Sequence, residues 1–172
     1  MPIYALGDRV PTIDATAYVH PDAVVIGDVV LGPQANVWPK AVLRGDFGTI
    51  VIGARTSIQD GSVVHATSRK PTSIGADCVV GHNAHLEGCT VEDSCLIGSM
   101  STVLSEAIVR TGALVAASAL VSPRTEVPSR AMALGVPCRI REEAIEEGRF
   151  ERIVALYVEN AQRYASELRR LG

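Results

Sequence analysis

Aromatic residues are scarce in this chain. They make up only 4% of its 172 residues, although 47% of the chain is hydrophobic. A core built around large rings is therefore excluded, while Val, Ile, Ala, Gly and Ser abound. A core of small and β-branched side chains favours a regular β architecture. The length is that of one ordinary domain.

The sequence also lacks a basic run, a long apolar run and a CxxC motif. The formal net charge is −3, so neither nucleic acid nor an anionic membrane is expected as a partner. The first residues, MPIYALGDRV, have no basic start, so we expect no signal peptide, no transmembrane segment and a cytoplasmic location. Without an export signal we also expect the cysteines to be reduced thiols.

The chain is rich in one feature, a six-residue repeat. From Val91 to Val127 seven aliphatic residues follow one another at intervals of six, and a small residue comes four positions after each of the first six. Eighteen aliphatic residues belong to this register: Val19, Val25, Leu31, Val37, Leu43, Ile52, Ile58, Val64, Ile74, Val80, Leu86, Val91, Ile97, Val103, Val109, Val115, Val121 and Val127.

A period of six fits neither a helix nor a simple alternating strand. It fits short strands joined by tight bends, where Gly, Asp and Asn supply a permissive backbone. Three such sides close a triangular coil of about 18 residues, and stacked coils make a solenoid. The repeat therefore predicts an all-β solenoid of about six coils. A β-sandwich is the alternative, but it would not hold one register over so many repeats.

The register slips at three points and changes near the C-terminus. We expect outward loops at two of the slips, GDFGTI (45–50) and HATSRKPTS (65–73), and loops on a rigid scaffold often carry function. GVPCR (135–139) predicts a turn, and an apolar stripe predicts a helix from Glu142, which Gly148 could divide in two. We expect residues 1–140 to form the solenoid and residues 141–172 a helix packed on its flank. A detached oligomerisation helix is the alternative.

The register also places side chains in space. Arg44, His65 and Glu87 each follow an aliphatic residue three repeats apart, so they should form one outward column with coils about 4.8 Å apart. His82 belongs to the preceding side of the triangle, so one copy is not expected to bring it to His65. A neighbouring copy could, which predicts a site between protomers and suggests a homotrimer.

Three of the four histidines, His65, His82 and His85, lie within 21 residues. A lone outward histidine is usually a solvated polar residue, but three on adjacent coils favour a metal site. Imidazole ligands make zinc the default metal, and Fe²⁺ or Co²⁺ fits as well. His85 and Glu87 flank an inward leucine, so both point outward and either could approach the metal.

Three motifs resemble those of the γ-class carbonic anhydrases, a family of left-handed β-helix proteins with hexapeptide repeats. They are RGD at 44–46, IQDGSVVH at 58–65 and VGHNAHLEGC at 80–89, and the resemblance extends over about residues 5–140. It implies a left-handed coil, a trimer and a metal at each subunit interface. It also implies a reaction in which a metal lowers the pKa of water and the hydroxide adds to carbon dioxide to give bicarbonate.

Carried over by position, His65 and His82 match the family's metal ligands. The family's third ligand is a histidine at the place that Glu87 occupies here. Glu87 either replaces it directly, or His85 coordinates and leaves Glu87 to accept a hydrogen bond or a proton. We favour His85 as the third ligand, because three imidazoles make the bound water most acidic.

The resemblance assigns four further roles. Arg44 and Asp60 match a pair that bridges subunits. Asp46 and Gln59 match residues beside the metal, where Gln59 helps to hold water or bicarbonate.

The sequence also departs from the family. Phe47 stands where the best-known branch has an acidic residue, and the loop after His65 is short and basic. Proton export would then use Glu87, another group or buffer, so hydration is expected to be slow or absent. Two other functions stay open: a weakly active or inactive trimeric scaffold or binding protein, and acyl-CoA transfer or thioester hydrolysis. The GVPCR stretch is compatible with both enzyme activities.

Overall fold

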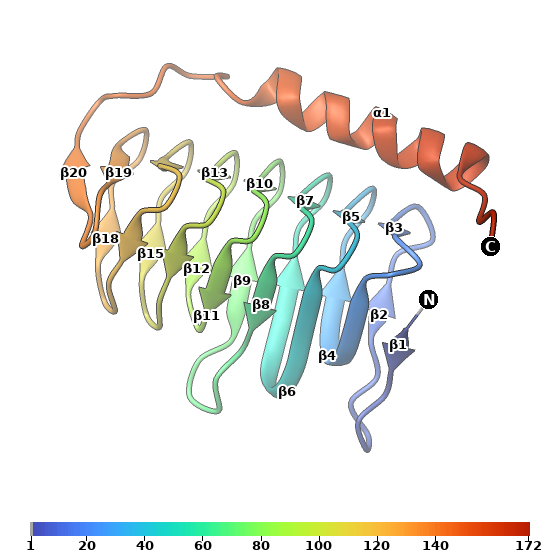
Figure 1. Cartoon of the computed structure of the whole chain (residues 1–172). Coiled ribbons are helices and arrows are strands. Elements are labelled where there is room, and N and C mark those ends of the chain that lie inside the picture. Colours follow the sequence, from blue (N-terminus) through green and yellow to red (C-terminus); the bar gives the residue numbers. More distant parts are fainter. Residues whose placement is uncertain (1) are drawn as a thin grey trace.

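The computed structural model describes residues 2–172 and is a left-handed parallel β-helix with one α-helix along its side (Figure 1). This confirms the predicted fold class. The prism has three faces, and its third face stacks seven parallel strands, so there are about seven coils where the repeat predicted six. The additional inward positions are Ile13 and Ala133, which continue the six-residue interval beyond Val19 and Val127, and Ile3, which pairs with Val25 outside this interval.

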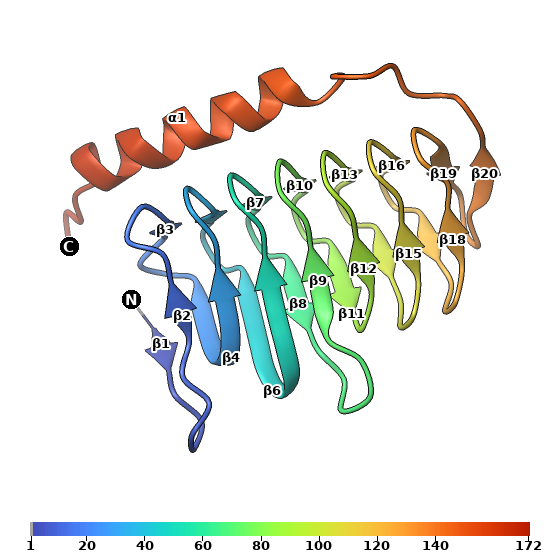
Figure 2. The same ribbon diagram turned by 180° about the vertical axis from the view of Figure 1, so that it is seen from behind.

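Each face is a stack of short strands (Figure 2). The first face holds β1 (Ile3–Tyr4), β8 (Val63–His65), β11 (His85–Glu87), β14 (Thr102–Val103) and β17 (Leu120–Val121). The second holds β2 (Thr12–Ile13), β9 (Thr72–Ile74), β12 (Thr90–Val91), β15 (Ile108–Val109) and β18 (Glu126–Val127). The third holds β3 (Tyr18–Val19), β5 (Asn36–Val37), β7 (Ser57–Ile58), β10 (Val79–Val80), β13 (Leu96–Ile97), β16 (Leu114–Val115) and β19 (Met132–Leu134).

Two long strands, β4 (Val24–Leu31) and β6 (Val42–Ile52), pass round the edge between the first and second faces and join them in one 12-stranded sheet. The outward excursion expected at GDFGTI is part of β6 rather than a separate loop. Gly45 and Ile50 pair with Gly27 and Val29 of β4, and residues 46–49 form the bulge between these two pairs. The second expected loop is present, between β8 and β9.

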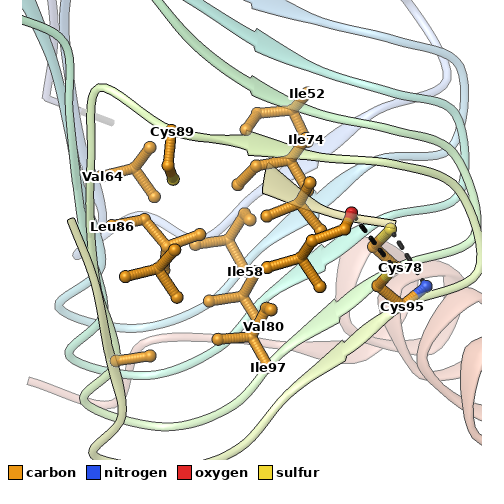
Figure 3. Close-up of a cluster of buried hydrophobic side chains, with 14 of the residues drawn as sticks. Ile52, Ile58, Val64, Ile74, Cys78, Val80, Leu86, Cys89, Cys95 and Ile97 are labelled. Carbon is orange, nitrogen blue, oxygen red and sulfur yellow. Dashed lines mark hydrogen bonds between the residues drawn. The ribbon is translucent and has the colours of Figure 1, made fainter. Parts of the chain in front are cut away.

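The core consists of aliphatic columns inside the prism (Figure 3). Ile58, Val80 and Ile97 are Cα partners on successive third-face strands and are fully buried. Cys78 and Cys95 lie beside them, and all four cysteines are free thiols, as expected. The interior of the prism is thus filled by aliphatic side chains that pack on the aliphatic side chains of the coils before and after.

The bends depend on the coils next to them more than on special residues. Met100 and Glu106 adopt left-handed φ angles of 59° and 65°, which glycine or asparagine adopts far more readily. The Met100 amide donates to the His82 carbonyl at 2.8 Å, and the Glu106 amide donates to the Gly88 carbonyl at 2.7 Å. Because the preceding coil fixes these amides, most bends hold residues other than the expected Gly, Asp and Asn.

The C-terminal helix starts later than expected. The turn at 135–138 leads into β20 (Arg139–Arg141), which pairs antiparallel with β19, and α1 spans Glu151–Glu167. Residues 142–150 form turns, since Gly148 takes a left-handed φ of 72° that interrupts a helix. The helix packs over β3, β5 and β7, where Trp38 contacts Tyr157 and Tyr164, and it therefore lies along the third face of the prism.

No helix within residues 2–172 is long and apolar enough to cross a membrane.

We expect Ile97→Ala to lower the free energy of unfolding by about 3 kcal/mol, because it opens a cavity in a fully buried column. Ile108→Ala is the matched control. Its side chain lies on the outer surface of β15 and is partly exposed, so we expect a loss of about 1 kcal/mol or less. Urea unfolding at one protein concentration measures both, and equal losses would contradict the inward column.

Candidate metal centre

The predicted column of polar residues is confirmed. Arg44 on β6 is the Cα partner of His65 on β8, and His65 is the Cα partner of Glu87 on β11. All three side chains point outward from the first face, whereas the neighbouring residues Val64 and Leu86 point inward and are fully buried. The hydrophobic register therefore sets the spacing of the polar residues.

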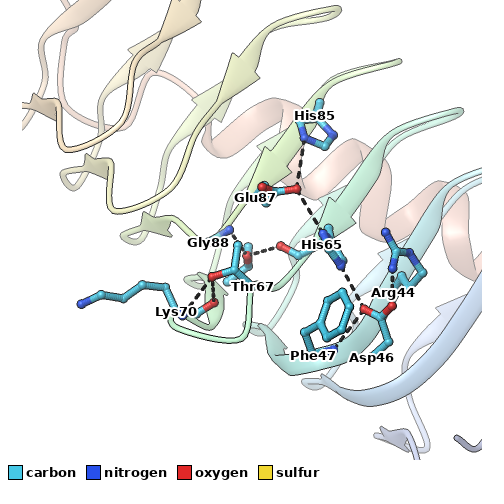
Figure 4. Close-up of polar contacts among 10 residues, drawn as sticks. Arg44, Asp46, Phe47, His65, Thr67, Lys70, His85, Glu87 and Gly88 are labelled. Carbon is cyan, nitrogen blue, oxygen red and sulfur yellow. Dashed lines mark hydrogen bonds and ion pairs between the residues drawn. The ribbon is translucent and has the colours of Figure 1, made fainter.

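His65 lies between two carboxylates (Figure 4). Its Nε2 is 2.9 Å from Asp46 Oδ1, and its Nδ1 is 3.1 Å from Glu87 Oε2. The side chain is only 11% exposed, and the ring of Phe47 approaches it edge-on with a centroid distance of 5.9 Å. Both ring nitrogens thus have an acidic neighbour, which holds the imidazole in one orientation.

Asp46 is placed by a close approach of two strands. Gly45 precedes it, and a Cβ on Gly45 would come within 2.4 Å of the Asp28 carbonyl oxygen, so no larger residue fits. Partial burial raises the pKa of the Asp46 carboxyl, but hydrogen bonds from His65 and Arg44 and the Arg44 charge outweigh this effect. The pKa therefore lies below its usual value, and Asp46 is an anion beside His65 at neutral pH.

Glu87 and His85 do not occupy equivalent positions. Glu87 is the Cα partner of His65, whereas His85 is the partner of Val63, two residues earlier on the same strand. The His85 Nε2 is 3.9 Å from Glu87 Oε2, so Glu87 lies between the two histidines.

His82 lies on another edge of the prism, at the bend after β10. Its Nδ1 is 2.9 Å from Asp60 Oδ2, and both side chains are about half exposed, at 49% and 48%. Gln59 precedes Asp60 at the end of β7 and is only 3% exposed. Arg44 pairs with Asp46 within the chain, and Asp60 pairs with His82.

One copy of the chain does not bring three candidate metal ligands together. Between residues 2 and 172 no group of three His, Cys, Asp or Glu side chains is placed to hold a metal ion. His65 and Glu87 form an adjacent imidazole and carboxylate, which are donor types that zinc accepts. Cys89 adds nothing, because it points into the core and burial raises the pKa of its thiol to about 12. The residues fit a metal only if another copy supplies a further donor.

Two contacts at this site have no signal in the sequence, namely the edge-on packing of Phe47 on His65 and the pairing of His82 with Asp60. Both depend on how far a side chain reaches from a bend.

Comparison with known proteins identifies several relatives. A scan against models of known protein families gives no match. The sequence is 41% identical over 146 residues to Gamma carbonic anhydrase 1, mitochondrial, of Arabidopsis thaliana, covering 81% of this chain and 53% of that protein. It is 34% identical over 154 residues to the carnitine operon protein CaiE of Escherichia coli K12, covering 89% and 79%. The chain spans 53% of the length of that Arabidopsis relative and 60% of the length of another, Gamma carbonic anhydrase 2, mitochondrial.

Solved structures agree with the fold. A Bacillus cereus protein described as a candidate acetyltransferase superimposes with a TM-score of 0.93 at 33% identity, over 96% of this chain and 98% of that one. A hexapeptide transferase family protein from Anaplasma phagocytophilum gives a TM-score of 0.90 at 30% identity, over 95% and 98%. From these relatives, and from the hexapeptide β-helix that it forms, the chain belongs to the γ-class carbonic anhydrase-like family.

Proposed function

We propose that this protein catalyses the metal-dependent, reversible hydration of carbon dioxide to bicarbonate, at sites shared between the copies of a homotrimer. The observation that carries the proposal is the column of Arg44, His65 and Glu87, with Asp46 bound to His65. The names of the Arabidopsis relatives support the choice of reaction.

A second copy is needed to complete the site. His65 and His82 lie on different edges of a three-sided prism, and each pairs with its own set of carboxylates. In a ring with threefold symmetry, one edge of each copy faces a different edge of the next copy. His82 of one copy would then meet His65 of its neighbour, with Gln59 and Asp60 lining the same half of the site.

The geometry moves our preference for the third donor from His85 to Glu87. Glu87 is level with His65 and within hydrogen-bonding distance of it, whereas His85 is one step back. His65, His82 and Glu87 would hold Zn²⁺, with Fe²⁺ or Co²⁺ as substitutes. The metal would supply the acidity that makes water a nucleophile for carbon dioxide.

The residues of the chain would do the rest. Asp46, fixed by Arg44, holds His65 in one orientation, and Phe47 covers one edge of its ring. A carboxylate donor at position 87 gives more negative charge to the metal than an imidazole, so we expect slow hydration. The apolar ring at Phe47 offers no proton acceptor, which acts in the same direction.

The second candidate function is a trimeric scaffold or binding protein without hydration activity. The exposed ring of Phe47 beside His65 favours it, because this ring takes space that an acidic proton acceptor would use.

For the metal site, we expect purified protein grown with zinc to contain close to one metal per chain. His65→Ala, His82→Ala and Glu87→Ala should each weaken zinc binding by more than about 100-fold, beyond the loss typical of residues that only contact a ligand. His85→Ala should weaken it by about tenfold or less. His20→Ala is the control, since its Nδ1 only accepts the Asp22 amide at another bend.

The same proteins should be assayed for carbon dioxide hydration by stopped flow and for hydrolysis of acetyl-CoA. Hydration above the buffer rate that is lost with the metal supports the proposal. Metal binding with hydration at the buffer rate favours the scaffold, and thioester hydrolysis by the wild type would replace the proposed reaction. If His85→Ala lost its zinc and Glu87→Ala kept it, His85 and not Glu87 would be the third metal ligand.

For Asp46, we expect Asp46→Asn to lower the free energy of unfolding at pH 7. The folded-state pKa is depressed, so the stabilisation is present above the ordinary carboxyl pKa of about 3.9 and is lost as the pH falls through the lower folded value. Urea unfolding in steps from pH 7 to pH 3 should show the two proteins converging in acid. A difference that stays constant across this range would mean that the Asp46 charge does not stabilise the fold.

A further inference from the structure

A buried threonine, Thr72, joins the two ends of the loop that follows His65. The loop leaves the first face after His65, the last residue of β8, and returns at Thr72, the first residue of β9. Thr72 is completely buried. Its hydroxyl donates to the His65 carbonyl oxygen and accepts from the Gly88 amide at 2.7 Å. The Gly88 amide also lies 3.2 Å from the His65 carbonyl.

These bonds lie where the two strands of the site separate. β8 and β11 pair as far as His65 and Glu87, after which β8 enters its loop and β11 turns at Gly88 with a left-handed φ of 59°. The Thr72 hydroxyl joins the His65 carbonyl to the amide of Gly88, the residue after Glu87. The His65 and Glu87 side chains approach to 3.1 Å on the outer surface (Figure 4). The backbone angles at this last rung therefore depend on Thr72.

We propose that Thr72 is the positioning residue of the site: its hydroxyl fixes the backbone at His65 and Gly88 so that His65 and Glu87 stand level as two donors to one metal ion. This role rests on the proposed function, because it concerns the same pair of donors. Residues behind metal ligands commonly change metal affinity by 10- to 100-fold when they are removed.

The chain contains a matched control for a purely structural role. Thr56 is also completely buried, and its hydroxyl donates to the Gly75 carbonyl at 2.6 Å and accepts from the Cys78 amide at 3.0 Å. Thr56→Val and Thr72→Val thus each remove one donated and one accepted hydrogen bond of a buried hydroxyl. The Thr56 bonds lie away from the site, and the Thr72 bonds are made to the backbone of the site. Thr72→Ser keeps the hydroxyl and serves as the conservative variant.

The experiment measures zinc affinity by competition with a chelating dye, together with the urea midpoint of each protein. We expect Thr56→Val and Thr72→Val to lose similar stability, and only Thr72→Val to bind zinc about tenfold or more weakly. Thr72→Ser should restore the affinity to within about threefold of the wild type. Equal affinities for the two valine variants, or a Thr72→Ser protein as weak as Thr72→Val, would overturn the proposal.

A second readout separates this proposal from the proposed function. The ¹⁵N shifts of the His65 ring report its contact with Glu87 in metal-free protein. Thr72→Val should move these shifts and Thr56→Val should leave them unchanged, whatever the affinity for zinc. If the wild type binds no zinc, the proposed function fails, and unchanged His65 shifts in Thr72→Val would overturn the positioning role as well.

Discussion

The stacking of one aliphatic residue on the next, coil after coil, is the constraint on which the rest of the structure depends. Leu43, Val64 and Leu86 are fully buried and aligned on adjacent strands. A slip of one residue would turn each side chain to the opposite side of its strand and bury polar groups, so the register is strongly fixed. The residues that follow these three aliphatics inherit that alignment. Arg44, His65 and Glu87 thus form a column because their inward neighbours pack well.

This dependence explains how much the sequence predicts. The six-residue interval gives the solenoid, the three faces and the polar column, because each follows from the inward positions alone. It does not give the course of the insertions. Residues 46–49 of β6 bulge outward between the pairs that Gly45 and Ile50 make with β4, and no local pattern shows this pairing. Several bends hold Met, Glu or Arg, because coil-to-coil hydrogen bonds override local preference. Contacts that depend on how far a side chain extends, such as that of Asp46 with His65, likewise cannot be predicted from the repeat.

The site combines a rigid backbone with an incomplete set of donors. One copy holds His65 firmly, between Asp46 and Glu87, on a face that stacked strands keep straight. The same rigidity prevents His82 from crossing to that face, since it sits at a bend and pairs with Asp60. A stiff prism cannot fold around a ligand, so in the function that we propose a second prism beside it would complete the site. Assembly and metal binding are therefore coupled in our account, and each should strengthen the other.

Subunit complementation tests this central claim most directly. His65→Ala and His82→Ala proteins are each expected to bind zinc too weakly to retain it through purification, but a mixed trimer can place an intact His65 beside an intact His82 from the neighbouring copy. Random mixing of equal amounts makes about a quarter of the interfaces intact in a threefold ring. After unfolding and refolding together, the mixture should therefore regain about a quarter of the wild-type zinc. Zinc that stays at the level of the separate variants would contradict a site shared between copies.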